Sequence, residues 1–384
     1  MGDSGIPHVQ WCQRRYKVQD ETSTQLHLLE AFSIKKDILE LGSRPQEYMR
    51  TSDYSEKWGR IFKNLQYVFQ TTNPVVCFAS SGTGAMDAAV GNLFPANSGT
   101  AVYINGGSFG KRWGDILNRY NINNIEIPVE FGESVEPKIV EDILEQNSEV
   151  KAVFATLNET SSGAVTDIKT LAQIVKKYPN CVLVVDCVSG LIVEELQMDD
   201  WGVDVVVSAS QKAMAIPPGL GFMSMSEKAL NLAKQNPTRP VYFDIFEYIK
   251  DWERNQTPFT PAVSLVEQLE LRLQKIVDEG LDAYRLRYQE NTKKIRQVLN
   301  GLGFSTFAKK PASCVTGIMT EKYNASEIVR IMREKYDIEI APSGGVLKDK
   351  FFRVGNFGAV GQDEIDRFAN AMKLTIEELN YDRK

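Results

Sequence analysis

The chain has 384 residues, of which 43% are hydrophobic and 24% are charged, and its formal net charge is −6 at pH 7. This composition is ordinary for a globular protein, and the acidic balance disfavours nucleic acid as a partner. No apolar stretch reaches the ~20 residues of a membrane-spanning helix, and the first residues lack the apolar core of a signal peptide. We therefore expect a cytoplasmic protein without a membrane partner, long enough for a large domain and a smaller one.

Cysteine and histidine usage excludes further kinds of chemistry. The five cysteines are scattered without a CxxC pair, and the only histidines are His8 and His27. Disulfides and zinc are therefore not expected, and the residues for Ser-His-Asp hydrolysis or histidine-based metal chemistry are missing. We expect no metal site.

The N-terminal part is predicted to be helical after a polar extension. Residues 1–24 show no clear period, whereas apolar residues recur at helical spacing through residues 26–41 and 54–69. Asn73-Pro74 breaks the second helix, and residues 75–79 are the first predicted strand.

A loop of small residues, SSGTGAMDAAV from Ser80, follows this strand. A strand that runs through such residues into a helix presents free backbone N–H groups at the helix N-terminus, which is a site for an anion. Gly82 and Gly84 would let a phosphate approach the backbone, and Thr83 could donate its hydroxyl. An ordinary strand–helix turn capped by serine or threonine is an equally open interpretation. The GxxxxGK[ST] pattern of triphosphate sites is absent.

Strands and helices then alternate, which predicts a doubly wound parallel sheet. Strands are predicted at residues 100–105, 125–129 and 152–157, and an amphipathic helix at 166–178. Phe109, in the glycine-rich loop after the first of these strands, could lie flat on a heteroaromatic ring or belong to the core. Thr160 lies in the hydroxyl-rich segment NETSSG, which could hydrogen-bond a ring oxygen or a substrate, or be a turn.

Residues 181–221 bring an acid and a lysine to the carboxyl ends of neighbouring strands. Two short β-branched runs, 182–185 and 203–207, are predicted to be adjacent buried strands. Asp186 ends the first run, and Lys212 follows the second, where open α/β sheets bind ligands. A partly desolvated lysine and a nearby carboxylate are the requirements of pyridoxal phosphate, which needs a Schiff-base amine and a protonated ring nitrogen. Singly, Asp186 could be a helix cap and Lys212 a solvated loop residue.

The C-terminal part is predicted to be a compact α+β domain. Residues 221–225 are the last strand of the sheet, 242–258 an extended loop fixed by prolines, and 264–301 helical. The remainder alternates strand 315–319, helix 325–336, strands 338–341 and 351–355, and helix 362–379. We therefore divide the chain into an N-terminal extension (1–24), a large domain (25–262), and a linking helix with a small domain (263–384).

Arg353 lies within an apolar run, FFRVGNFG. An arginine on a short buried strand needs an anionic partner. This partner could be a substrate carboxylate that Arg353 binds bidentately, or a carboxylate of the protein in a structural ion pair.

From about Leu28 onward the chain resembles the class V (fold type I) pyridoxal-phosphate aminotransferases, most closely the alanine/serine–glyoxylate group. The resemblance rests on motifs in the family's order: SSGTGAMDAAV, NGGSFGKR, NETSSG, VVDCVSG, SASQKAMAIPPGLGF, TPFTPAVSL and FRVGNFG. It implies an α/β large domain with a mostly parallel seven-stranded sheet sandwiched by helices, and a smaller α+β domain. It also implies pyridoxal 5'-phosphate as cofactor and ping-pong transfer from a small amino acid to a 2-oxo acid such as glyoxylate or pyruvate.

The resemblance further implies roles for single residues. Lys212 is implied to form the aldimine and shuttle a proton, Asp186 to hold the ring nitrogen, and Arg353 to bind the substrate carboxylate. The resemblance places Gly82, Thr83, Gly84 and Gln211 at the phosphate, Phe109 on the ring face and Thr160 at the ring hydroxyl. The other implied cofactor-binding residues are Ser81 and Val188. Thr260, in the loop 257–260, is implied to reach the phosphate site of a neighbouring subunit, which makes the enzyme an obligate homodimer.

One segment departs from the family, and other functions stay open. LEAFS at residues 29–33 replaces a Pro-Gly-Pro loop, so Glu30 and Phe32 are expected at the substrate pocket and could admit a cationic or larger amine. A 2-aminoethylphosphonate or other amine–pyruvate transaminase shares the chemistry. A cysteine desulfurase usually has a histidine where this chain has Gln211, and a loop cysteine, for which Cys314 is the candidate. A binding protein without turnover is disfavoured by the intact lysine–acid pair.

Overall fold

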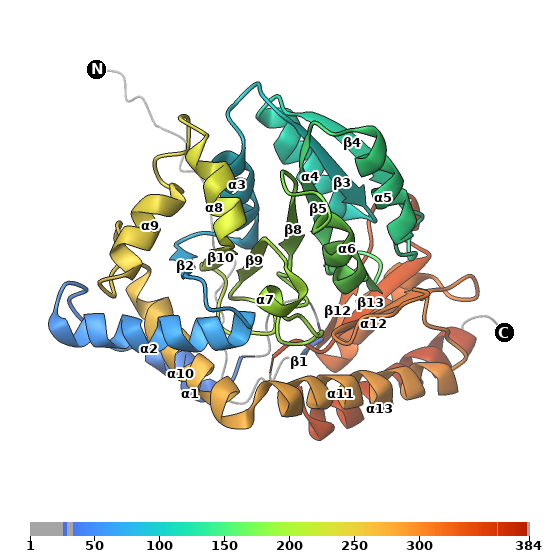
Figure 1. Cartoon of the computed structure of the whole chain (residues 1–384). Coiled ribbons are helices and arrows are strands. Elements are labelled where there is room, and N and C mark those ends of the chain that lie inside the picture. Colours follow the sequence, from blue (N-terminus) through green and yellow to red (C-terminus); the bar gives the residue numbers. More distant parts are fainter. Residues whose placement is uncertain (1–25, 29–33, 359, 382–384) are drawn as a thin grey trace, which may run out of the picture.

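The computed structural model describes residues 26–28, 34–358 and 360–381. At its centre lies a seven-stranded sheet of order β2-β10-β9-β8-β5-β3-β4 (Figure 1). Its strands are β2 (Val75–Phe78), β3 (Thr100–Asn105), β4 (Asn123–Pro128), β5 (Val150–Thr156), β8 (Val182–Asp186), β9 (Val205–Ala209) and β10 (Gly221–Met225). Only β10 runs antiparallel to its neighbours. The mostly parallel seven-stranded sheet predicted from the sequence is confirmed.

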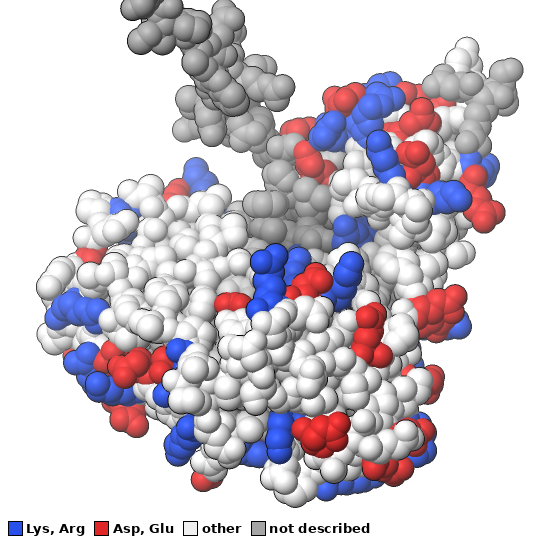
Figure 2. Space-filling model, turned by 90° about the horizontal axis from the view of Figure 1, so that it is seen from above, with Lys and Arg blue, Asp and Glu red and all other residues white. Residues whose placement is uncertain are grey.

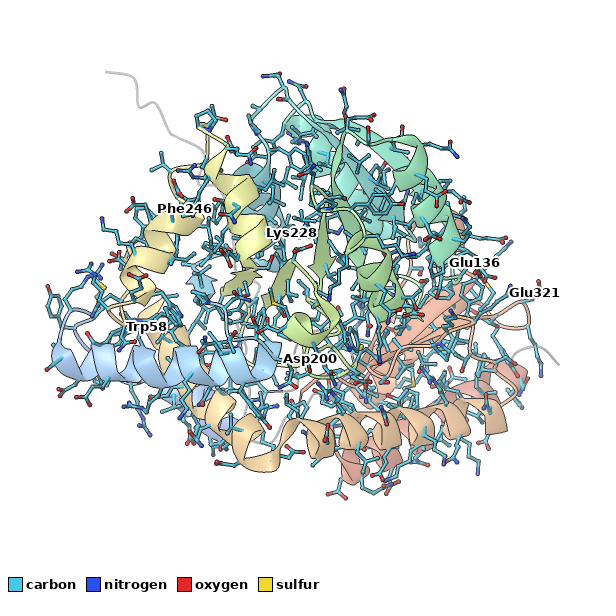
Figure 3. All side chains as sticks on the ribbon, in the orientation of Figure 1. Trp58, Glu136, Asp200, Lys228, Phe246 and Glu321 are labelled. Carbon is cyan, nitrogen blue, oxygen red and sulfur yellow. The ribbon has the colours of Figure 1, made fainter. Side chains whose placement is uncertain are left out.

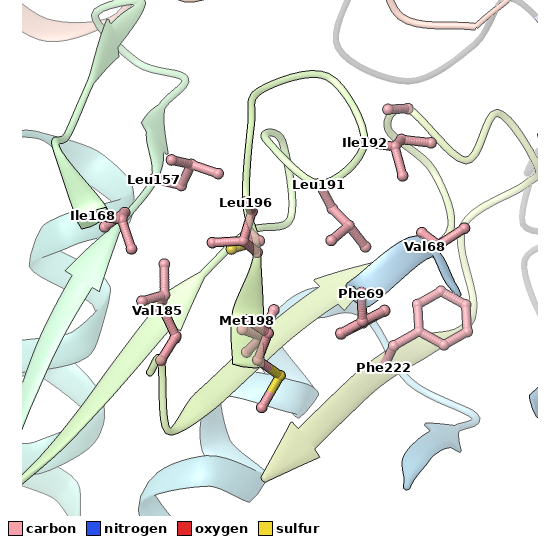
Figure 4. Close-up of a cluster of buried hydrophobic side chains, with 14 of the residues drawn as sticks. Val68, Phe69, Leu157, Ile168, Val185, Leu191, Ile192, Leu196, Met198 and Phe222 are labelled. Atoms are coloured by element: carbon pink, nitrogen blue, oxygen red, sulfur yellow. The ribbon is translucent and has the colours of Figure 1, made fainter. Parts of the chain in front are cut away.

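Both faces of this sheet are covered by helices because its strands are apolar on both sides. In β8, Val182 and Val184 belong to one core, and Leu183 and Val185 to the other. The first core is closed by α3 (Gly82–Leu93), α4 (Ser108–Arg119), α8 (Glu227–Lys234) and α9 (Ile245–Trp252). The second is closed by α2 (Ser52–Phe69), α5 (Pro137–Gln146), α6 (Ile168–Val175) and α10 (Val263–Glu279). Figure 4 shows part of the second core, where Phe222 of β10 lies near Phe69 of α2.

A second sheet of order β1-β12-β13-β11 carries the C-terminal helices. Its elements are β1 (Leu26–Leu28), β11 (Val315–Met319), β12 (Ile338–Pro342), β13 (Phe351–Gly355), α12 (Ala325–Tyr336), the short η1 (Gly345–Leu347) and α13 (Gln362–Tyr381). Helix α11 (Leu281–Gly301) is separated from α10 by Gly280, whose φ of 81° is readily adopted only by glycine. The predicted smaller α+β unit is thus present, while the domain boundaries stay a prediction.

Two predicted segments differ in the structure. The helix predicted over 26–41 is wrong at its start, because residues 26–28 form β1; in the described residues of this range the helix is α1 (Lys36–Leu41). Leu26 and Leu28 pair in parallel with Ile338 and Ile340, and both leucines are buried. Long-range pairing overrides the local helical spacing here.

The second difference lies in the loop predicted over 242–258, which contains α9. The side chain of Asp244 caps this helix by accepting the N–H of Phe246 at 3.0 Å, and Ile245 and Tyr248 are buried beneath it. Figure 3 shows Phe246 on this helix, where the Arg239 guanidinium lies 4.8 Å from the ring centroid. An Asp followed by apolar residues at helical spacing is a helix-start signal that the proline-based prediction overlooked.

The surface and the helices agree with the composition. In the face shown in Figure 2, Lys and Arg side chains alternate with Asp and Glu, and large areas between them are uncharged. Among the helices of the described ranges, none combines the length and apolarity needed to cross a bilayer.

The remaining short elements are α7 (Met198–Trp201) and the hairpin of β6 (Asn158–Glu159) and β7 (Ala164–Val165).

Candidate active site

The register of the central sheet brings three loops to one edge. Phe78, the last residue of β2, pairs with Gly221, which also pairs with Ala209 at the end of β9. Asp186, the last residue of β8, pairs with Thr156 at the end of β5. The segments that follow β2, β8 and β9 therefore start side by side, as expected for ligand-binding loops of an open α/β sheet.

A cavity of about 520 Å³ lies at this edge. It is lined by Ser81, Gly82, Thr83, Met86, Phe109, Arg112, Asp186, Val188, Gln211, Lys212, Ala341, Pro342 and Arg353. Nine of these were predicted from the sequence. Ala341 and Pro342 belong to β12 and Arg353 to β13, so the cavity lies between the carboxyl edge of the central sheet and the second sheet.

Asp186 and Lys212 open into this same cavity, although both are buried, with 4% and 6% of their surfaces exposed. Burial, together with the charge of Glu159, raises the pKa of Asp186 to about 6. The N–H of Val188, donated to the Asp186 carboxylate at 2.8 Å, and the charges of Arg112 and Lys212 act against this shift. The Lys212 amine lies 5.1 Å from the centroid of the Phe357 ring.

Helix α3 begins at the cavity and offers an anion site. Its N-cap residue Ser81 makes no side-chain cap bond, and Gly82 and Thr83 of its first turn line the cavity. A Cβ on Gly82 would lie 2.7 Å from Val188 Cγ2, so only glycine lets the helix start come this close to the segment after β8. The buried Gln211 Oε1 has no hydrogen-bond partner within the described part of the chain, and as an oxygen it can only accept. The Nε2 group of this amide, which donates, and the helix start fit a phosphate-bearing ligand.

The segment after β5 holds the start of α4 in place. The Glu159 carboxylate accepts the N–H groups of Gly110 at 2.9 Å and Phe109 at 3.2 Å. Thr160 is buried, and its Oγ1 lies 2.6 Å from Ser189 Oγ. Phe109 therefore lines the cavity from a fixed helix start, and Thr160 stands behind the lining residues.

Arg353 reaches across from the second sheet. Its Nη1 donates to the carbonyl of Thr160 at 2.9 Å, and its Nη2 donates to the carbonyl of Pro342 at 3.3 Å. The guanidinium is thereby held at the wall of the cavity, with its orientation set by two main-chain oxygens.

Three predicted residues of the described part of the chain do not line its cavity. Gly84 lies further along α3, Thr160 is behind the wall, and Thr260 is exposed on the surface. Glu30 and Phe32 lie outside the described residues.

The structure adds residues that the sequence reasoning did not select. Arg112 lines the cavity, donates to Thr83 Oγ1 at 3.0 Å and lies 4.9 Å from the centroid of the Phe109 ring. A signal for it existed, because residues three apart on a helix share a face, and Arg112 follows Phe109 by three. Glu159 and Ser189 do not line the cavity but contact residues near it: Glu159 accepts from Phe109 and Gly110, and Ser189 Oγ lies against Thr160 Oγ1. No sequence pattern indicated these contacts.

Comparison with known protein families identifies the family to which this chain belongs. The family model for class-V aminotransferases matches residues 43–346. The chain belongs to the class-V aminotransferases. This family depends on pyridoxal phosphate, so the protein is a pyridoxal-phosphate-dependent transaminase.

Several named proteins are similar to this chain. An uncharacterized aminotransferase of Methanocaldococcus jannaschii is 33% identical over 357 residues, 91% of this chain and 92% of that protein. A Synechococcus protein named soluble hydrogenase, small subunit, is 32% identical over 348 residues, 90% of each chain. An L-aspartate–glyoxylate aminotransferase of Paracoccus denitrificans is 31% identical over 326 residues, 81% of this chain and 82% of that one.

A solved structure shows the same fold over nearly the whole length. The alanine–glyoxylate aminotransferase of Nostoc sp. is 24% identical, covers 95% of this chain and 98% of its own, and superposes with a TM-score of 0.88. The predicted fold type I architecture is confirmed.

Proposed function

We propose that this class-V aminotransferase moves an amino group from a small amino acid of the alanine or serine type to a 2-oxo acid such as glyoxylate or pyruvate. The observation that carries the proposal is one cavity shared by a lysine, a buried carboxyl, a helix N-terminus and an arginine. Relatives named for glyoxylate support the acceptor. Transfer in two half-reactions through one site gives ping-pong kinetics.

The residues of the cavity fit pyridoxal phosphate from end to end. Ser81, Gly82 and Thr83 at the start of α3, with Gln211, would hold the phosphate. Phe109 and Val188 would cover the ring, and Asp186 would face its nitrogen. Thr160, which lies behind the cavity wall, keeps the role at the ring hydroxyl that the sequence predicts. When bound, the cofactor withdraws electrons from the substrate Cα and carries the amino group between the half-reactions.

Asp186 and Lys212 would act on different protons, Asp186 on that of the ring nitrogen and Lys212 on that of the substrate Cα. A cation near Asp186 lowers the pKa of its carboxyl, so a protonated ring nitrogen would keep Asp186 ionised at neutral pH although burial raises that pKa to about 6. The Lys212 amine would remove the proton from the substrate Cα and return it on the opposite step. Arg353 would hold the substrate carboxylate and so fix the Cα in reach of this amine.

The proposal has three further parts. Thr260 would reach the phosphate site of a second copy, which makes the enzyme a homodimer; its exposed position supports a role outside its own chain. Gly84, Glu30 and Phe32 keep the cofactor- and substrate-binding roles expected from the sequence. The cytoplasmic location also stays a prediction.

Chemical trapping tests the central assignment. We expect wild-type protein reconstituted with pyridoxal phosphate to show a visible absorption band, and borohydride reduction to fix the cofactor on the peptide containing Lys212. Lys212→Ala should lack both signals, whereas Lys111→Gln, an exposed lysine on α4, should keep them. A wild type that binds the cofactor without a visible band, or labelling of another lysine, would contradict the proposal.

Arg353 gives a second prediction, on substrate affinity. Arg353→Gln should raise the KM for carboxylate substrates by a factor corresponding to about 2–4 kcal/mol, because a charge-assisted bidentate contact is lost. Arg353→Lys should recover part of it. An unchanged KM would assign Arg353 a structural role, to which its contacts with Thr160 and Pro342 belong.

The same absorbance assay separates the alternatives. Bleaching of the band by alanine or serine supports the proposal, and bleaching by 2-aminoethylphosphonate alone would favour the amine–pyruvate alternative. The desulfurase alternative is disfavoured by Cys314, because burial raises the pKa of its thiol and its Sγ–H donates to the carbonyl of Ser189 at 3.5 Å. A thiol held protonated in the interior is a poor nucleophile.

A further inference from the structure

Arg112 lines the cavity and is positively charged, but the proposed function gives it no role. It projects from the first turns of α4, lines the cavity beside Thr83 and Phe109, and makes no ion pair with a carboxylate of the described residues. A partly buried guanidinium in such a place is best satisfied by an anionic ligand.

The position of Arg112 is fixed from behind. Glu159 accepts the N–H groups of Phe109 and Gly110, and Ser161 Oγ accepts the N–H of Ser108 at 3.1 Å. The first N–H groups of α4 are therefore occupied by protein acceptors and are unavailable to a ligand. The anion site at this end of the cavity is left to the start of α3 and to Arg112.

The contact between Arg112 and Thr83 determines how Thr83 can act. Arg112 Nη1 donates to Thr83 Oγ1 at 3.0 Å, so this oxygen serves as an acceptor. A hydroxyl has one hydrogen, and with its oxygen accepting from an arginine that hydrogen is left to donate to another acceptor. The residues that accompany Thr83 at this end, Ser81, Gly82 and Gln211, are all uncharged. Arg112 is the charged side chain beside them.

We propose that Arg112 is a further cofactor-binding residue, which offsets the charge of the cofactor phosphate and orients the Thr83 hydroxyl as a donor to it. This inference rests on the proposed function, because it takes pyridoxal phosphate as the ligand. It assigns the two arginines of the cavity to different anions: Arg112 to the phosphate at the α3 end, and Arg353 to the substrate carboxylate at the β13 end.

Comparing two aldehydes that differ only in the phosphate tests the proposal. Apo-protein is titrated with pyridoxal phosphate and with pyridoxal, and binding is followed by absorbance. Arg112→Gln should weaken the binding of pyridoxal phosphate by about 10- to 100-fold and leave that of pyridoxal unchanged. Arg112→Lys should lie between, and Lys111→Gln, which removes a neighbouring exposed charge, should match the wild type.

A double-mutant cycle tests the second half of the proposal. Thr83→Val should also weaken binding of pyridoxal phosphate, and its effect should shrink in the Arg112→Gln background, because the two side chains act together. Melting curves of the apo-variants establish that they fold. Equal losses for pyridoxal phosphate and pyridoxal, or no loss for either, would overturn the role of Arg112. A wild type that does not bind pyridoxal phosphate would instead overturn the proposed function.

Discussion

Asp186 is a carboxyl group whose burial has a measurable effect on the stability of the cofactor-free protein. Its pKa rises from 3.8 to about 6 in the folded state. Above pH 6 the group is ionised in both the folded and the unfolded state, and the folded state carries the full cost of the buried charge, ~3 kcal/mol. Well below pH 3.8 the group is neutral in both states, and the cost disappears.

We therefore predict that Asp186→Asn stabilises the apo-protein at pH 8 by up to ~3 kcal/mol, and that this gain falls as the pH is lowered from 6 to 4. Denaturant unfolding of wild type and variant across this range measures it. Asp282→Asn, whose side chain is fully exposed, is the control and should show no such dependence. An Asn variant that is less stable than the wild type at pH 8 would contradict the assignment.

The site residues found from the sequence are those whose position follows from a single strand. Asp186 and Lys212 were predictable because apolar β-branched runs mark the ends of β8 and β9, and parallel strands end at one edge. Arg112 was not, because its place in the cavity depends on two helix starts, of α3 and α4, that approach each other in space. Glu159 was missed for a related reason: its partners are backbone N–H groups, which carry no residue signature.

At the scale of the element, the central strands were predictable, and the differences occur where tertiary contacts compete with local pattern. Strand β3 and strand β10 have their predicted bounds, since their apolar runs are flanked by turn residues. Strand β1 is three residues long and exists through its pairing with β12. A segment of that length has no periodicity of its own, so its state follows from a partner more than 300 residues away.

The start of α3 depends on close packing against the segment after β8. A Cβ on Gly82 would lie 2.7 Å from Val188 Cγ2 and 3.2 Å from Ala209 Cβ, so the helix start would have to move away from the cavity. We predict that Gly82→Ala weakens cofactor binding and lowers the free energy of unfolding by about 1–3 kcal/mol, the usual cost of overpacking.

Removing the neighbour should reverse most of this effect. Adding Val188→Ala to Gly82→Ala frees the space that the new methyl group needs, so we expect the double variant to be more stable than Gly82→Ala alone. Gly301→Ala, at the end of α11 with no atom within 4 Å of the added carbon, is the matched control and should be neutral or stabilising. A Gly82→Ala variant as stable as the wild type would show that the helix start can shift freely.

At the scale of the whole molecule, the site is closed by contacts between the two sheets. Arg353 of β13 donates to the carbonyl of Thr160. Glu194, in the segment after β8, accepts the backbone N–H of Ser313, and its carboxylate also accepts from Asn158 Nδ2 at 3.2 Å. These bonds tie the substrate end of the cavity to the cofactor end, so the distance between Arg353 and Lys212 is set by the whole fold rather than by one loop.

The proposed contact of Thr260 with the phosphate site of a second copy would extend this dependence beyond one chain, and complementation can test it. Thr260→Glu would bring a carboxylate to the partner's phosphate site and abolish cofactor binding there through charge repulsion. Lys212→Ala abolishes the covalent site of its own chain. Each homodimer should therefore lack the visible band of the bound cofactor.

A heterodimer of the two variants, purified through two different tags, should regain that band in one of its two sites. The chain with Thr260→Glu still has Lys212, and its phosphate site meets the unchanged Thr260 of the other chain. If Thr260 acted within its own chain, both sites of the heterodimer would be defective and no band would return. Thr260→Ser, which keeps the hydroxyl, should retain the band in the homodimer, because the contact to the phosphate needs the oxygen and not the methyl group.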